Sequence, residues 1–228
     1  MISPPDCLFA DEHLVLVNKP SGLLVHRGLG QDRVVAMSLV RDALGRHVFP
    51  VHRLDRGTSG VLCFALSSEM AAALQRSFTE GGVHKRYLAL VRGVPPDQAL
   101  IDHPVPKCEG GERVSALTEM RRLATARFAI GDFSLVEAMP KTGRFHQIRR
   151  HLKHLGHPLV GDVNYGRGEI NRFFRAEFGL NRLALHAASI AFQHPVTGES
   201  IEVMAPIPEE LKRVIDLFGE FDFDRFGQ

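Results

Sequence analysis

The chain has 228 residues, of which 44% are hydrophobic and 24% charged, a composition typical of a soluble globule with one large domain or two lobes sharing a cleft. Three widely separated cysteines without a C-x-x-C pattern argue against a disulfide framework and a zinc ribbon. The net charge of +2 does not by itself indicate a nucleic-acid partner, and no apolar run of about 18 residues predicts a membrane span. Because the N-terminus lacks a secretory signal pattern, we expect a cytoplasmic protein.

The first half of the chain alternates short apolar runs with turn signals. The turn Lys19–Gly22 joins two predicted strands, because Pro20 presets φ and Gly22 permits positive φ. Ser67 or Ser68 is expected to cap a helix. Strands are predicted at 14–18, 23–26, 47–51, 61–66 and 84–91, and helices at 33–44 and 69–78.

The second half adds more strands and three helices. Residues 104–113 are rich in proline, glycine and charge, and we expect an exposed loop there. Gly131-Asp132 signals a hairpin turn. Strands are predicted at 124–130, 133–138, 183–192 and 200–204, and helices at 144–156, 170–178 and 208–218. Many strands with few interleaved helices favour an α+β fold with a largely antiparallel sheet.

The segment His52–Gly60 is a polar, glycine-punctuated loop between two apolar runs, where catalytic residues are common. Its one carboxylate, Asp55, stands between Arg53 and Arg56, and a nearby guanidinium favours the ionised form. Asp55 is therefore a candidate for the reactive group, although an Asp–Arg pair of this kind often serves stability alone.

The segment Lys141–His157 holds five Lys or Arg and four His but no Asp or Glu. On a helix its apolar residues would share one face and its cations would spread over the others, which predicts a surface for a phosphate backbone. Tyr87 follows the basic residues Lys85 and Arg86, and its ring could stack on a nucleobase or simply be half-buried in a strand.

Other chemistries find little support. The histidines His151, His154 and His157 do not overlay on a helix and lack an acidic partner, so we predict no zinc site. Neither a G-x-S-x-G nucleophile motif nor a phosphate-binding G-x-x-x-x-G-K-[ST] motif occurs. The residues alone therefore indicate a nucleic-acid site with a single carboxylate, and they do not name the reaction.

Five motifs in order resemble those of the RluA-type pseudouridine synthases and together cover about residues 8–205. The segment His52–Gly60 matches the signature H-R-L-D-x-x-T-S-G of that family at every fixed position. The other similar segments are Val17–Gly22, Lys85–Tyr87, Thr142–Arg149 with His157–Asp162, and Leu185–Ala187 with His194–Gly198.

The resemblance implies a mixed, mainly antiparallel sheet flanked by helices, with a central cleft, in one catalytic domain over residues 1–228 without an N-terminal S4 domain. It implies Asp55 as the catalytic aspartate, Tyr87 as the ring that stacks on the target base, and Arg149 as the partner of Asp55. It implies no metal and no organic cofactor. The residues predicted to bind the RNA are Arg53, Arg56, Thr58, Arg144, His146, Gln147, Arg150, Lys153 and Leu185.

A finer similarity, in Val25–Arg27, Ile148–Leu152 and Asn171 with Phe178–Leu180, is to the branch that modifies uridine 65 of tRNA. A ribosomal-RNA synthase of the same family, a non-catalytic RNA-binding module and a hydrolytic nucleosidase remain as alternatives. The atom that Asp55 attacks, C1′ or C6, and the group that removes the C5 proton, Tyr87 or a water, both stay open. We also expect a monomer.

Overall fold

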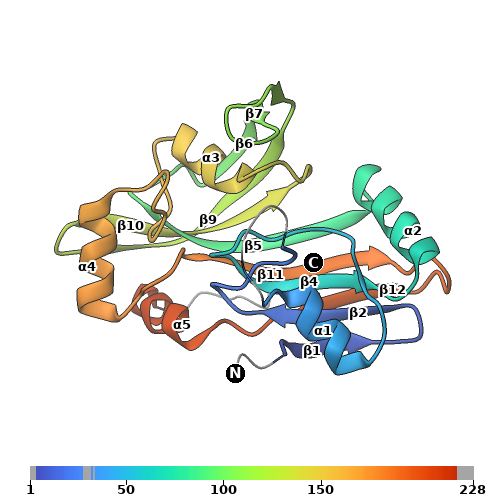
Figure 1. Ribbon diagram of the computed structural model, residues 1–228. Coiled ribbons are helices and arrows are strands. Elements are labelled where there is room, and N and C mark those ends of the chain that lie inside the picture. The colour runs from blue at the N-terminus through green and yellow to red at the C-terminus, as the bar shows by residue number, and fades with distance from the viewer. Residues whose placement is uncertain (1–3, 28–31, 33, 220–228) are drawn as a thin grey trace. The chain divides into compact units, whose positions relative to one another are not determined.

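The computed structural model describes residues 4–27, 32 and 34–219 (Figure 1). The chain forms two compact units. The first comprises Met1–Tyr87, Lys141–Gly143 and His186–Pro206, and the second comprises Leu88–Pro140, Arg144–Leu185 and Ile207–Gln228. Strand β5 (Val83–Arg92) has residues in both units. The prediction of a single catalytic domain stays a prediction.

The first unit is built on a mainly antiparallel sheet. Its strands are β1 (Asp6–Ala10), β2 (Leu14–Lys19), β3 (Phe49–Pro50), β4 (Ser59–Ala65), β11 (Leu185–Gln193) and β12 (Ser200–Met204). Hydrogen-bonded neighbours follow the order β1–β2–β4–β11, with β12 beside β11 and β3 beside β4. The β4–β11 pair is parallel, with Ser59 opposite His186 and Gly60 opposite Ala187. This pair lies where the predicted site loop enters β4.

Two helices cover this sheet. Helix α1 (Ala36–Leu44) lies across β2 (Figure 1), and its Ala36 and Val40 belong to one buried cluster with Val15 and Phe64. Helix α2 (Ser68–Thr79) begins as predicted, because the Ser67 hydroxyl accepts the Met70 amide at 3.1 Å. Alternation along β2 and β4 thus sends side chains to two buried faces, which explains their nearly continuous apolar sequences.

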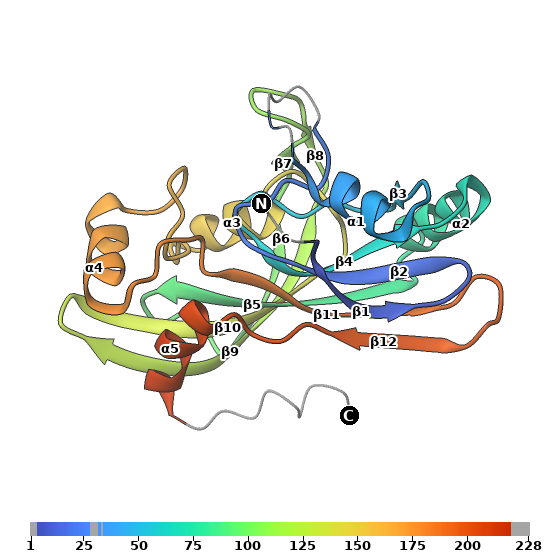
Figure 2. The same cartoon turned by 60° about the horizontal axis from the view of Figure 1, so that its bottom comes forward.

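The second unit is built on a long hairpin. Its strands are β6 (Gln98–Asp102), β7 (Val105–Pro106), β8 (Arg113–Val114), β9 (Leu117–Phe128) and β10 (Gly131–Pro140), and its helices are α3 (Gln147–His154), α4 (Gly168–Phe178) and α5 (Glu209–Ile215), followed by a 3-10 turn at Asp216–Phe218. The order β10–β9–β6 is antiparallel, and β7 pairs separately with β8. Helices α4 and α5 lie beside the hairpin (Figure 2).

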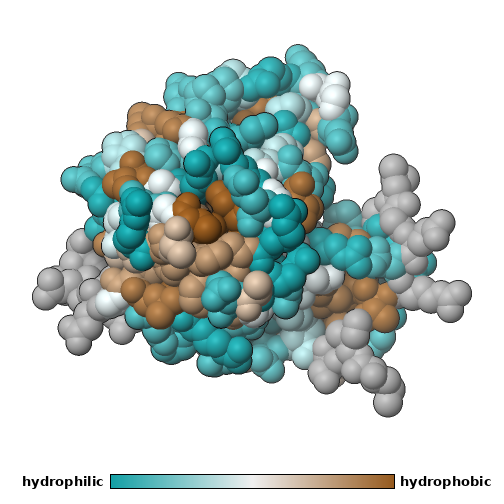
Figure 3. Space-filling view, turned by 90° about the vertical axis from the view of Figure 1, so that its left-hand side faces the viewer, coloured by the Kyte–Doolittle hydropathy of each residue, from teal (hydrophilic) through white to brown (hydrophobic). Residues whose placement is uncertain are grey.

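Aromatic side chains fill the core of the second unit. Phe133 of β10 and Phe174 of α4 are fully buried with ring centroids 4.8 Å apart, in an edge-to-face arrangement. On the side of the molecule that carries α4, apolar residues lie among hydrophilic ones (Figure 3). The exposed large apolar side chains of the second unit include Ile130, Val163 and Leu217. Single exposed apolar side chains of this kind are normal on a protein surface.

The predicted α+β class with mainly antiparallel pairing is confirmed. One predicted strand, 23–26, is wrong. The backbone carbonyls of this segment accept hydrogen bonds from outside it. The Leu23 carbonyl accepts from the Lys19 ammonium, the Leu24 carbonyl from the Ala36 amide, and the Val25 carbonyl from the Met37 amide. The start of α1 therefore takes the place of a strand partner.

Several boundaries also differ from the prediction. The hairpin turn lies at 129–130, two residues before the predicted Gly131-Asp132, because Gly131 (φ 128°) already pairs with Phe128. The basic helix is shorter than predicted and starts only at Gln147. The predicted loop at 104–113 contains β7 and the first residue of β8. Strands β1 and β6 were not predicted; each has a single strand partner and a short sequence without clear alternation.

The described helices include none that is both long enough and apolar enough to cross a membrane.

Candidate active site

The residues between β3 and β4, 51–58, form the loop that carries Asp55, which we call the Asp55 loop. Asp55 is half-buried within it, and its carbonyl accepts the Thr58 amide at 3.0 Å, which closes a turn around Asp55 and Thr58. Thr58 and Leu54 are buried, so the loop is anchored on both sides of Asp55. The predicted loop is therefore a tight, anchored turn.

Hydrogen bonds connect the turn after β2 to this loop. Lys19 is fully buried, and its ammonium donates to the carbonyls of Pro20 and Leu23 at 2.8 Å and of Arg56 at 3.4 Å. The Gly22 amide also donates to the Arg56 carbonyl at 2.8 Å, and the Ser21 hydroxyl donates to the Gly57 carbonyl at 2.7 Å. Because these bonds reach the residues directly after Asp55, they restrict where its carboxylate can lie.

The exit of the loop into β4 is equally constrained. The Ser59 hydroxyl and His186 Nδ1 lie 2.7 Å apart, and His186 Nε2 lies 3.3 Å from the Ala205 carbonyl oxygen. Gly60 has φ 113°, and a Cβ at that position would come within 2.1 Å of the Ala187 carbonyl oxygen. The small residues of the T-S-G end of the signature thus allow β4 and β11 to approach closely.

Tyr87 and Asp55 are brought together within the first unit. Burial raises the pKa of the Tyr87 phenol, and the negative charge of Asp55 raises it further. The half-buried ring packs against the apolar cluster that contains Leu54 and Ala187. At neutral pH Tyr87 is therefore protonated and uncharged, with its ring beside the Asp55 loop.

The two arginines that flank Asp55 in the sequence both lie at the protein surface. Arg56 is exposed; its Nη2 donates to Asp32 at 2.7 Å and its Nε to the Gly22 carbonyl at 3.0 Å. Arg53 is also exposed. Arg56 therefore also bonds to the turn after β2, and the carboxylate with which it pairs is that of Asp32.

Arg149, the predicted partner of Asp55, lies in the second unit on α3. Its Nε and Nη2 donate to the two carboxylate oxygens of Asp162 at 2.8 and 2.9 Å, in a buried bidentate pair. Burial of Asp162 would raise its pKa, but the hydrogen bonds and charge of Arg149 and the backbone amides of Tyr165 and Asn164 leave that pKa below its ordinary value. The prediction that Arg149 also pairs with Asp55 joins residues of the two units and stays a prediction.

A cationic cluster surrounds Tyr165 in the second unit. The guanidinium carbons of Arg149 and Arg150 each lie 5.0 Å from the centroid of this ring, and Lys153 Nζ lies 5.7 Å from it. Arg150 also lies 5.5 Å from the Phe145 ring centroid. Of the five cations of the predicted basic segment, Arg149 is buried and Arg150 is half-buried, whereas Lys141, Arg144 and Lys153 are exposed.

His146, immediately before α3, has an unusual backbone. Its φ of 52° and ψ of 29° are left-handed, which costs free energy for a residue other than glycine. Its Nδ1 lies 3.0 Å from the Tyr165 hydroxyl, and its ring stacks on Phe145 with centroids 3.8 Å apart. These contacts hold the start of α3 against Tyr165.

The remaining predicted RNA-binding residues differ in exposure. Arg144 is exposed, and its Nε donates to the Ser115 carbonyl at 3.3 Å. Gln147 is buried, and its amide donates to the Leu117 carbonyl and the Thr118 hydroxyl at 2.9 Å. Leu185 and Thr58 are also buried. Their roles in RNA binding stay predictions, and Gln147 has a clear structural role.

The three histidines of the basic segment make separate contacts. His151 lies 2.9 Å from both the Thr118 hydroxyl and the His103 carbonyl oxygen, His154 stacks on the His103 ring, and His157 lies 2.9 Å from the Arg92 carbonyl oxygen. In the described part of the chain, no three His, Cys, Asp or Glu side chains are grouped so that they could hold a metal ion.

Sequence reasoning did not single out four residues that build these arrangements: Lys19, Ser21, Asp162 and Tyr165. Lys19, Ser21 and Asp162 lie inside segments that resemble family motifs, so the motif positions themselves were the available signal. Their bonding partners lie far away in sequence or in loops, and residue pattern alone does not reveal such partners.

The chain is similar to known proteins over most of its length. The pattern of the family described as RNA pseudouridylate synthase matches residues 13–154. A protein of Vibrio cholerae named tRNA pseudouridine synthase C is 41% identical, over 94% of this chain and 96% of its own length. A protein of the same name from Salmonella typhi is 42% identical, over 94% of this chain and 90% of its own.

Solved structures show the same fold. Human RNA pseudouridylate synthase domain containing 4 superimposes with a TM-score of 0.74 and 25% identity, covering 93% of this chain and 92% of the human chain.

Proposed function

The chain belongs to the RNA pseudouridylate synthase family, and from this premise we propose that its substrate is tRNA and its target uridine 65. As a member, it is an isomerase that converts uridine in RNA to pseudouridine. Relatives about 40% identical over nearly the whole chain carry the name tRNA pseudouridine synthase C, which supports the choice of tRNA.

The reaction sets clear demands on the site. Uracil must be detached from ribose C1′, turned, and rejoined through C5, without any redox change. The target base must also leave its stack before the enzyme can reach it. The site therefore needs a fixed reactive group, a surface that replaces the lost stacking, and cations for the RNA backbone.

The observation that carries the proposal is that Asp55 lies beside Tyr87 in a loop fixed by hydrogen bonds and close packing. Asp55 lies in a turn that Lys19 and Ser21 hold from one side and Gly60 and the β4–β11 pair hold from the other. We propose that Asp55 is the group that attacks the nucleotide or assists cleavage of its glycosidic bond. A group held this firmly loses little entropy when it enters the transition state.

We assign Tyr87 as the stacking platform for the displaced base. Its ring packs against the apolar cluster beside the Asp55 loop, and its phenol, whose pKa is raised further by burial and by Asp55, is uncharged, which suits stacking on a base. The same shift makes Tyr87 a poor proton acceptor in the free enzyme.

Arg149 has a different role in the proposal. A guanidinium carries five N–H donors, and Asp162 takes two of those of Arg149. The bidentate pair fixes the plane of the guanidinium, and we propose that this arginine stabilises the Asp55 anion during the reaction. The remaining predicted RNA-binding residues would contact the backbone, with Arg150 and Lys153 as its principal cations. We propose a cytoplasmic monomer.

The first test is the variant Asp55→Asn, with Asp42→Asn on the exposed face of α1 as a matched control. We expect Asp55→Asn to lose pseudouridine formation while retaining its affinity for RNA, because Asp55 supplies chemistry and no phosphate contact. Product is measured on tRNA transcripts, and affinity by titration. Turnover near that of the control variant would refute the role of Asp55.

The second test concerns the substrate. Pseudouridine is mapped in tRNA and ribosomal RNA from cells with and without the gene. Loss of the modification at uridine 65 of tRNA is expected. If the modification is lost only from ribosomal RNA, then ribosomal RNA is the substrate instead of tRNA, while the assignment as a pseudouridine-forming isomerase still holds.

A further inference from the structure

Lys85 of β5 is a half-buried lysine. Among the described residues, no carboxylate lies within 4 Å of its ammonium, and burial lowers its pKa to about 8. A partly desolvated cation without an anionic partner is unfavourable for the folded protein. Groups with strongly perturbed pKa values cluster at functional sites, where a bound ligand can supply the missing charge.

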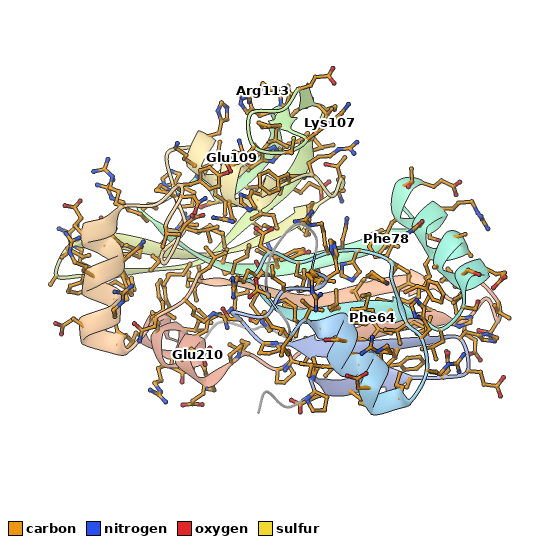
Figure 4. All side chains as sticks on the ribbon, in the orientation of Figure 1. Phe64, Phe78, Lys107, Glu109, Arg113 and Glu210 are labelled. Carbon is orange, nitrogen blue, oxygen red and sulfur yellow. The ribbon has the colours of Figure 1, made fainter. Side chains whose placement is uncertain are left out.

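The immediate neighbours of Lys85 are aromatic and uncharged. Its Nζ lies 5.7 Å from the centroid of Phe78, near the end of α2 (Figure 4), and the opposing ring of His52 stacks on Phe78 at 5.0 Å. His52 Nε2 accepts the Cys63 amide at 3.0 Å. Burial, together with the charge of Lys85, lowers the pKa of His52 to about 3, so His52 is neutral and adds no second positive charge beside the ammonium.

Lys85 also lies next to the predicted stacking residue. Lys85 and Tyr87 are two positions apart on β5, so their side chains project to the same side of the strand, about 7 Å apart along it. The charge of Lys85 acts on His52, and the charge of Asp55 acts on Tyr87. The Asp55 loop therefore runs along β5, with Lys85 near its beginning and Tyr87 near its reactive carboxylate.

We propose that Lys85 binds a backbone phosphate of the RNA next to the nucleotide whose base stacks on Tyr87. The inference rests on the proposed function, because it takes RNA as the ligand and Tyr87 as its stacking platform. A phosphodiester carries one negative charge and accepts hydrogen bonds from an ammonium, so it supplies the anion that the protein lacks at this point. The distance between Lys85 and Tyr87 corresponds to about two residues of strand, which one nucleotide can span.

The test uses Lys85→Met, which keeps the packing on Phe78 but removes the charge, and Lys85→Arg, which keeps the charge. Arg76→Met, an exposed cation of α2 two residues before Phe78, is the matched control. The measurements are KM and kcat for pseudouridine formation, and the affinity for single-stranded RNA at several salt concentrations.

We expect Lys85→Met to raise KM about tenfold, the loss that one charged hydrogen bond represents, with a smaller change in kcat. Its affinity for RNA should also depend less steeply on salt, by about 0.7 in the log–log slope, because one phosphate contact is lost. Lys85→Arg should restore both quantities. Wild-type KM and salt dependence in Lys85→Met would overturn the proposal, and so would equal effects of Arg76→Met.

A pH series separates the role of the charge from that of packing. Between pH 7 and 9 the affinity of the wild type for RNA should fall as Lys85 loses its proton, whereas that of Lys85→Arg should not show this fall. Any change that comes from the RNA itself appears in both proteins. A wild type that forms no pseudouridine in tRNA would refute the proposed substrate, while the RNA titration would still decide the role of Lys85.

Discussion

Replacing Asp162 by asparagine should strongly destabilise the second unit. The Asp162 carboxylate accepts two hydrogen bonds from Arg149 and two more from the amides of Asn164 and Tyr165 at 2.9 and 3.0 Å. Asparagine keeps the shape of the side chain but removes the charge, so the buried Arg149 guanidinium would lose the carboxylate that accepts two of its hydrogen bonds.

The size of the effect follows from burial. The side chains of Arg149 and Asp162 are 9% and 0% exposed, so water screens neither charge. Removing one partner of a buried pair typically costs about 3–5 kcal/mol, a large share of the roughly 5–15 kcal/mol by which domains are stable. Asp132→Asn is the matched control, since its partner Arg127 is 76% exposed and such pairs contribute at most about 1 kcal/mol.

The same pair predicts a pH dependence. Burial raises the folded-state pKa of Asp162, but the hydrogen bonds and charge of Arg149, together with the amides of Tyr165 and Asn164, bring it below its ordinary value. The stabilisation is therefore present above the unfolded-state value of about 3.9 and is lost as the pH falls through the lower folded-state value. The free energy of unfolding of the wild type should fall in that acid range, and Asp162→Asn should lack this part of the fall.

Urea unfolding of the two variants and of the wild type measures the effect. A double-mutant cycle with Arg149→Met isolates the interaction, because the double variant no longer contains an unpaired buried charge. A cost of Asp162→Asn no larger than that of Asp132→Asn would refute the reasoning, as would a coupling energy near zero.

Three further outcomes follow from the site. Gly60→Ala should lower the melting temperature markedly, at a cost of about 3 kcal/mol or more, because its Cβ would collide with the Ala187 carbonyl; calorimetry measures this. Ser21→Ala should cost only about 0.5–1.5 kcal/mol of stability but lower kcat more than it raises KM, because its bond to Gly57 positions the Asp55 loop; steady-state kinetics tests this. Arg150→Ala should weaken RNA binding and reduce its salt dependence, and an unchanged slope in a titration would remove Arg150 from the interface.

Local patterns were sufficient for much of the fold. The Ser67 cap, strand β12 at 200–204 and the helices α2 and α4 all lie where propensity and periodicity placed them. These elements depend on bonds and packing within a few residues, which a sequence window contains. Strand 23–26 was wrong for the opposite reason, since α1 determines where its carbonyls bond.

The sequence by itself determined the fold class, the family and the candidate residues Asp55, Tyr87 and Arg149, because the motifs that carry them are contiguous and ordered. Only the tertiary structure showed how the Asp55 loop is held, by a buried lysine and a hydroxyl some 36 residues earlier in the chain. It also separated the basic helix into a buried, paired Arg149 and the outward cations Arg150 and Lys153. The physical reason is that burial, ion pairing and the pKa of a side chain depend on neighbours distant in sequence, and a residue pattern does not record them.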